Sequence, residues 1–245
     1  MVWSCLVSIL PGMAQTEKLT DYVNPFVGTD GYGNVYPGAQ IPFGGIQISP
    51  DTDSRFYDAA SGYKYNHLTL MGFSLTHLSG TGIPDLGDFL FIPGTGEMKL
   101  EPGTHEDPDQ GYRSRYSHDK EWASPNYYAV ELADYGVKAE MTSGVRSGMF
   151  RFTYPESDNA FIMIDMNHTL WQSCEWSNLR MINDSTITGY KLVKGWGPER
   201  HVYFTATFSK KLTGLRFVQD KKPVIYNTSR FRSSYEAWGK NLMAC

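Results

Sequence analysis

Residues 127–142 read YYAVELADYGVKAEMT, and this stretch decides the fold class. Tyr128, Val130 and Leu132 alternate with more polar neighbours, and so do Val137, Ala139 and Met141. A period of two places one set of side chains on each face of a β-strand. The intervening Asp-Tyr-Gly at 134–136 is typical of a turn. The stretch therefore predicts two antiparallel strands that each bury one face.

The same alternation recurs along the chain, at residues 150–154 and 202–208, and Ala160–Ile164 is a continuous apolar run. A continuous run favours a strand covered on both faces. Turn signals rich in Pro, Asn, Asp and Ser separate these segments at 155–159 and 183–185. Short strands at such intervals predict an all-β fold, an antiparallel β-sandwich. The one helical candidate is the short segment Ser234–Leu242.

Composition is that of a globular protein rather than a nucleic-acid binder. The 245 residues carry a net charge of −4, with 41% hydrophobic and 14% aromatic residues. No long basic run is present, so the electrostatic footprint of a nucleic-acid partner is missing. Abundant aromatics suit strands, and their flat rings also suit stacking on sugars.

The first residues, 1–14, differ from the rest: a short apolar run is followed by Pro11-Gly12-Met13-Ala14. This pattern is typical of a secretory signal with cleavage before Gln15, and it is too short to span a bilayer. We therefore expect a signal peptide remnant at 1–14 and one domain over 15–245. Of the three cysteines, Cys174 is expected to be a buried, inert thiol within the folded body.

The loop-rich segment Asn24–Asp88 is where we expect a site, because such loops carry function more often than stability. Its glycines match neither a dinucleotide-binding motif nor a phosphate-binding loop, so they are interpreted as turn residues. Asp51-Thr52-Asp53 lacks the rest of a calcium loop and is interpreted as turn-capping. The six histidines form no zinc-binding spacing. These motifs therefore indicate neither a nucleotide site nor a metal site in the chain.

The richest stretch is Gly72–Asp88, in which hydroxyls, His77 and two carboxylates lie among glycines. Such groups can grip vicinal sugar hydroxyls. Asp85 and Asp88 permit two interpretations. They are either a glycosidase carboxylate pair or, more simply, turn caps that accept from backbone N–H groups.

Several motifs in this region and beyond resemble glycoside hydrolase family 92. They run in the family's order from Asp21 to the end of the chain: Asp21–Thr29, Pro37–Gly44, Ser49–Thr52, Ser61–Tyr65, Gly72–Ser74, Thr76–Gly82, Asp85, Gly87–Asp88, Tyr112–His118, Ala123–Tyr128, Gly195–Trp196, Tyr203–Phe204 and Phe208–Lys210.

The resemblance implies a calcium-dependent, inverting exo-α-mannosidase, exported by a glycan-degrading bacterium to the periplasm, the cell surface or the medium. It implies a galactose-mutarotase-like supersandwich packed on an (α/α)₆ barrel that carries the catalytic carboxylates and the calcium ligands and is absent here. The sandwich would lend loops to the pocket for a mannose-containing glycan. The substrate-binding residues so implied are Phe26, Gly28, Ser79, Gly80, Thr81, Gly82, Asp85, Leu86 and Asp88.

Three positions depart from the family pattern. Leu86 replaces an aromatic residue that some members place against the neighbouring sugar, which leaves the linkage specificity open. Lys64 and Leu75 replace commoner histidines, so one polar contact is expected to be lost at each.

The segment Gly239–Ala244 resembles the beginning of another strand, and we expect the sandwich to be incomplete at the C-terminus, with a strand partner missing. The alternative function is a stand-alone carbohydrate-binding module without catalysis.

Overall fold

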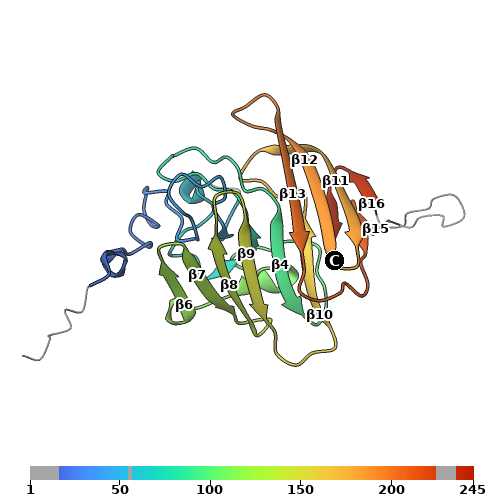
Figure 1. Ribbon diagram of the computed structural model, residues 1–245, viewed down its shortest axis with the longest axis horizontal. Helices are drawn as coiled ribbons and strands as arrows, with labels where there is room; N and C mark the ends of the chain where they lie inside the picture. Colours follow the sequence, from blue (N-terminus) through green and yellow to red (C-terminus); the bar gives the residue numbers. More distant parts are fainter. Residues whose placement is uncertain (1–16, 55–56, 225–235) are drawn as a thin grey trace, which may run out of the picture.

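The computed structural model describes residues 17–54, 57–224 and 236–245, so the expected leader lies outside the described residues. Its largest sheet (Figure 1) has the order β1-β3-β4-β10-β17-β14-β15. The bounds of its strands are Ser49–Asp51 (β1), Gly72–Ser74 (β3), Leu90–Thr95 (β4), Ala160–Asp165 (β10), Leu242–Ala244 (β17), Phe217–Gln219 (β14) and Lys222–Pro223 (β15). The pairs in this sheet are antiparallel.

Two four-stranded sheets accompany it, and they appear on either side of β4 in Figure 1. One is formed by Glu121–Ser124 (β6), Tyr127–Leu132 (β7), Val137–Ser143 (β8) and Gly148–Thr153 (β9), and the other by Arg200–Thr207 (β13), Thr186–Lys194 (β12), Ser173–Asn183 (β11) and Glu236–Gly239 (β16). A short ladder joins Thr69–Leu70 (β2) to Ser114–Arg115 (β5). The helical elements are single 3₁₀ turns at Leu19–Tyr22 (η1), Tyr57–Ala59 (η2), Pro108–Gln110 (η3) and His118–Lys120 (η4).

The strands predicted from alternation are confirmed. β7 and β8 pair around the turn at 133–136, where Gly136 has a φ of 63°. Val130, Leu132, Val137 and Ala139 are buried as expected. In β13 the inward Phe204 is less exposed than the outward Tyr203, again as the alternation predicts. The all-β prediction therefore holds at the level of individual strands.

Successive residues of the seven-stranded sheet pack into different cores. Phe91 of β4 and Ile164 of β10 join the core that faces β11 and β12. Their neighbours Ile92 and Met163 join the core on the opposite face. A sheet covered on both faces explains why Ala160–Ile164 reads as a continuous apolar run, although Ala160 itself is exposed.

The two four-stranded sheets share the core of the seven-stranded sheet. The ring of Phe91 lies 5.3 Å from that of Phe150 on β9 and 5.8 Å from that of Phe204 on β13. Aromatic rings at such separations are in packing contact. The molecule is therefore a sandwich whose second layer is built from two sheets.

The C-terminal residues differ from expectation. Within Ser234–Leu242, residues 236–239 form β16 rather than a helix, because Ala237 and Trp238 pair with Leu179 and Asn178 of β11. The final strand, β17, lies between β10 and β14 and so has a neighbour on each side. The edges of that sheet are β1 and β15 instead. The last strand, β17, therefore does not lack a pairing partner.

Candidate functional site: two loops held by buried charges

Two loops that carry expected site residues meet at Asn34. The backbone carbonyl of Asn34 accepts from the Gly80 N–H at 2.7 Å, while the next residue, Val35, donates to the Gly28 carbonyl at 3.2 Å. Gly28 has a φ of 84°, which suits glycine and confirms its interpretation as a turn residue. The loops Phe26–Asn34 and Ser79–Gly82 therefore form one continuous surface.

The side chains of these loops vary in exposure. Phe26 is half-buried, with its ring 5.7 Å from that of Tyr65 in an edge-to-face arrangement. Ser79, Gly80 and Gly82 are exposed, whereas the Thr81 hydroxyl donates to the Ile83 carbonyl. The side-chain oxygen of Asn34 is buried and has no hydrogen-bond partner among the described residues. This junction thus offers the exposed backbone of Ser79, Gly80 and Gly82 to a ligand.

Asp85 and Asp88 occupy different environments one turn apart. The Asp85 carboxylate accepts from the Leu86 N–H at 2.6 Å, so Asp85 caps its own turn as the simpler interpretation predicts. Leu86 has a φ of 73° and Phe89 a φ of 59°, which each cost about 1–3 kcal/mol of backbone strain. Such strain persists only where the surroundings impose it.

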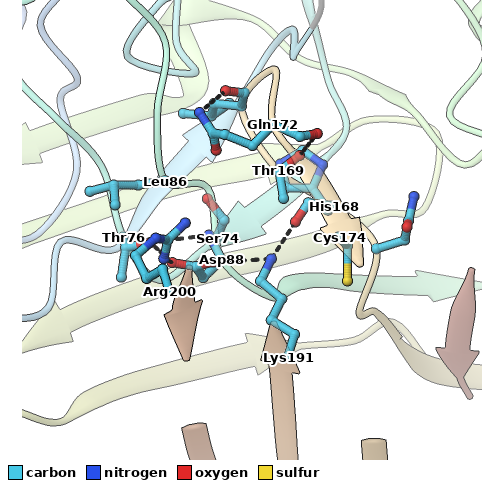
Figure 2. A network of polar contacts seen from close by, with 12 residues as sticks. Ser74, Thr76, Leu86, Asp88, His168, Thr169, Gln172, Cys174, Lys191 and Arg200 are labelled. Carbon is cyan, nitrogen blue, oxygen red and sulfur yellow. Dashed lines mark hydrogen bonds and ion pairs between the residues drawn. The ribbon is translucent and has the colours of Figure 1, made fainter. Parts of the chain in front are cut away.

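Asp88 is fully buried and is surrounded by donors (Figure 2). The Thr76 hydroxyl donates to it at 2.7 Å, the Lys191 ammonium lies 3.1 Å away, and Arg200 forms a short hydrogen bond to it. Burial raises the pKa of Asp88, but the charges of Lys191 and Arg200 outweigh it and hold the pKa below its usual range. Asp88 is therefore an internal anchor, out of reach of a substrate, and neither a turn cap nor one of two accessible carboxylates.

Arg200 links the anchor to the surface. While one guanidinium nitrogen bonds Asp88, the other lies 3.8 Å from the Asp85 carboxylate and has no hydrogen-bond partner among the described residues. Arg200 begins β13, and Lys191 lies in the middle of β12. The second four-stranded sheet thus fixes the turn Asp85–Asp88.

A second buried carboxylate extends the network. The Lys191 ammonium donates to the His168 carbonyl at 2.6 Å, and the His168 and His77 imidazoles each lie 2.8 Å from the Asp51 carboxylate. Burial opposes ionisation of Asp51, yet the two histidines keep its pKa well below the usual range. The interpretation of Asp51 as a turn cap is therefore wrong, because its oxygens are used by imidazoles from two distant segments.

Lys64 also differs from expectation. Its ammonium is buried and bonds the Gly31 carbonyl, with the Asp30 carboxylate 3.9 Å away. Lysine at this position thus provides a polar contact to the loop that contains Gly28. Leu75, by contrast, packs on two apolar cores as a partly buried side chain.

Sequence reasoning missed Lys191 and Arg200, although a signal for both exists. Lys191 alternates in phase with the inward residues Ile187 and Val193, and Arg200 is in phase with Val202 and Phe204. A cation on the buried face of a strand requires an anion in the core. That requirement points to a buried carboxylate elsewhere in the chain.

The described residues gather no group of three or more His, Cys, Asp or Glu side chains suited to a metal ion. Cys174 is buried and unpaired, and burial raises the pKa of its thiol. No helix in the described part of the chain has the length and apolar character that crossing a bilayer requires.

Comparison with known proteins identifies the family to which this architecture belongs. The model of the glycosyl hydrolase family 92 N-terminal domain matches residues 22–243. An uncharacterized secreted glycosidase of Arthroderma benhamiae is 30% identical over 139 residues, which cover 56% of this chain and 17% of that protein.

Solved structures agree with the family match. The family GH92 glycosyl hydrolase ccman5 has a TM-score of 0.74 at 27% identity, over 92% of this chain and 30% of its own. The inverting mannosidase of family GH92 from Bacteroides thetaiotaomicron shares the fold, with a TM-score of 0.72 at 22% identity over 94% of this chain and 29% of its own. The chain spans less than a third of each of these proteins. A match over residues 22–243 covers nearly the whole chain, and it leads to the conclusion that the chain belongs to glycoside hydrolase family 92, as its N-terminal domain.

Proposed function

We propose that this chain is the non-catalytic N-terminal part of a secreted exo-α-mannosidase that removes mannose from glycans with inversion at the anomeric carbon. Its role is to supply loops to the substrate pocket and to pack on a helical catalytic domain of the same protein. The bacterial setting, periplasmic, cell-surface or extracellular, belongs to the proposal as well.

One observation carries this role. The Gly28 and Gly80 loops are joined at Asn34, and the neighbouring turn at Asp85 is held by Arg200. Exposed backbone and a carboxylate beside a guanidinium are groups that hydrogen-bond sugar hydroxyls. Because buried charges fix the turn, these groups are preorganised for a ligand, which lowers the ordering cost of binding.

The chemistry of inversion requires two carboxyl groups on either side of the glycosidic bond. One protonates the leaving oxygen and the other activates a water molecule, at a separation of roughly 6.5–9.5 Å. Asp88 is sealed by Lys191 and Arg200 and is out of reach of a substrate. We therefore assign both catalytic carboxylates to the remainder of the parent enzyme. Calcium is assigned there too, since the described residues do not gather a metal-binding group.

The assignment is tested by incubating the purified chain with α-linked mannobioses and measuring released mannose. We expect no hydrolysis, and turnover by the chain alone would refute the placement of the catalytic groups. Isothermal titration with mannose and mannobioses separates the two functions considered. Strong binding by the chain alone would favour a stand-alone carbohydrate-binding module over half of a composite pocket.

A further inference from the structure

Trp171 stands out beside the candidate site. Its side chain is 57% exposed, and its backbone has a φ of 70°, a left-handed conformation that bulky residues rarely adopt. Because more than half of the indole is exposed, its burial contributes little free energy to offset the strain of the backbone. Its retention there calls for a role outside packing.

The loop around Trp171 is fastened to the turn that carries Asp85. The Leu170 N–H donates to the Leu86 carbonyl at 2.9 Å, and the Gln172 side-chain amide donates to the Pro84 carbonyl at 2.9 Å. Trp171 is the residue between these two attachments.

Internal hydrogen bonds make the same loop rigid. The Thr169 hydroxyl donates to the Gln172 carbonyl at 2.8 Å (Figure 2). The His168 ring is bonded to Asp51. The indole is therefore presented in one place rather than swinging on a free loop.

A second ring accompanies the indole. Tyr57, which is also 57% exposed, has its ring centroid 5.3 Å from that of Trp171, at an interplanar angle of 53°. A tilted pair leaves ring surface of both residues open to a ligand. The nearby turn adds the Asp85 carboxylate, whose side chain is 12% exposed beside Arg200.

We propose that Trp171, supported by Tyr57, is a stacking platform for a pyranose ring of the mannoside chain, beside the Asp85–Leu86 turn. An apolar sugar face lies on the indole while the sugar hydroxyls meet the polar groups of the turn. This inference rests on the proposed function and adds a residue that determines which glycans bind.

The test uses ¹⁵N-labelled chain and the indole N–H signals of its tryptophans, titrated with methyl α-mannopyranoside and an α-mannobiose at up to tens of millimolar. The Trp171 signal, identified by its loss in Trp171→Phe, is expected to shift saturably. Trp238, which is 51% exposed on β16, is the matched control and is expected not to respond. Glycerol tests for unspecific contact, and a comparable shift of Trp171 with glycerol overturns the proposal.

The decisive variant is Trp171→Gly. Glycine adopts this backbone conformation without strain, so the urea midpoint is expected to stay unchanged or rise. Mannobiose binding, followed at the amides of Gly80, Gly82 and Leu86, is expected to weaken about tenfold, the equivalent of one lost ring-stacking contact. Loss of stability with unchanged binding would mean that Trp171 is merely structural.

The outcomes separate the inference from the proposed function. If the loop amides respond to mannobiose and Trp171 does not, the platform is refuted and the proposed function stands. If neither responds, the platform is refuted, while the proposed function, in which the chain supplies only half of a composite pocket, is decided by the hydrolysis experiment above.

Discussion

Replacing Asp88 by Asn removes one charge from the centre of the sandwich while keeping the shape of the side chain. The Asp88 and Lys191 side chains are both 0% exposed and 3.1 Å apart, whereas the Arg200 side chain is 27% exposed. Arg200 can turn toward water after the substitution. Lys191 cannot, because it is enclosed in the core, where Phe89 lies 5.1 Å from its ammonium.

The cost follows from that difference. Removing one partner of a buried ion pair costs about 3–5 kcal/mol because the other charge stays behind without compensation. The asparagine still accepts from Thr76, so we expect the lower part of this range, about 3–4 kcal/mol. Domains have total stabilities of about 5–15 kcal/mol, so about a fifth or more of the stability is at stake.

Urea unfolding followed by tryptophan fluorescence measures the effect. With a slope of about 2–3 kcal/mol per molar urea, the midpoint should fall by about 1–2 M. Asp109→Asn, at an exposed partner of Arg115, is the control and should leave the midpoint unchanged. Adding Lys191→Met to Asp88→Asn should recover stability, since it removes the stranded charge. A double variant as unstable as the sum of both single variants would refute the reasoning.

Three further predictions concern the same network. Arg200→Leu should accelerate amide hydrogen exchange at Leu86 while leaving the β7–β8 hairpin protected, and equal acceleration in both would point to global destabilisation instead. Folding lowers the pKa of Asp51, so its ionised carboxylate stabilises the protein above the pKa of the unfolded state, which is about 3.9. This stabilisation is lost as the pH falls toward the pKa of the folded state. Urea midpoints between pH 4 and 2 should therefore fall more steeply in the wild type than in Asp51→Asn. Gly62→Ala, at a φ of 87°, places a Cβ on the Asp51 carboxylate and should lower the free energy of unfolding by at least about 2 kcal/mol. Gly80→Ala, at a φ of 75° with open space around the new Cβ, should lower it by about 1 kcal/mol. Similar losses of stability in urea unfolding would show that the Asp51 contact is unimportant.

The fold was accessible from the sequence because local rules decide it. Alternation in 127–142 and the turn at Gly136 involve residues close in sequence, and they predict β7 and β8 directly. β16 was interpreted as helical because its strand character depends on β11, whose pairing residues lie 56–62 positions earlier. Short segments with a distant partner carry little periodicity of their own.

The site was only partly accessible. Composition and glycines located the loops around Gly28 and Gly80, but the burial of Asp88 depends on Lys191 and Arg200 from the other sheet. The role of Asp51 similarly depends on His168, which is 117 positions away. Ion pairs between residues so far apart cannot be predicted from the local sequence, which shows only a cation on the apolar face of a strand.

The anchoring of Asp88 has a consequence for when the turn Asp85–Asp88 becomes ordered during synthesis. Arg200 follows Asp88 by 112 residues, so a growing chain exposes the turn for as long as the ribosome needs to add them. At about 5–20 residues per second, that delay is about 6–22 s. During this time the carboxylate has no cation beside it, and Leu86 has nothing to hold its left-handed backbone. The turn Asp85–Asp88 therefore precedes the residue that fixes it, and it acquires its final shape only after β13 has been synthesised.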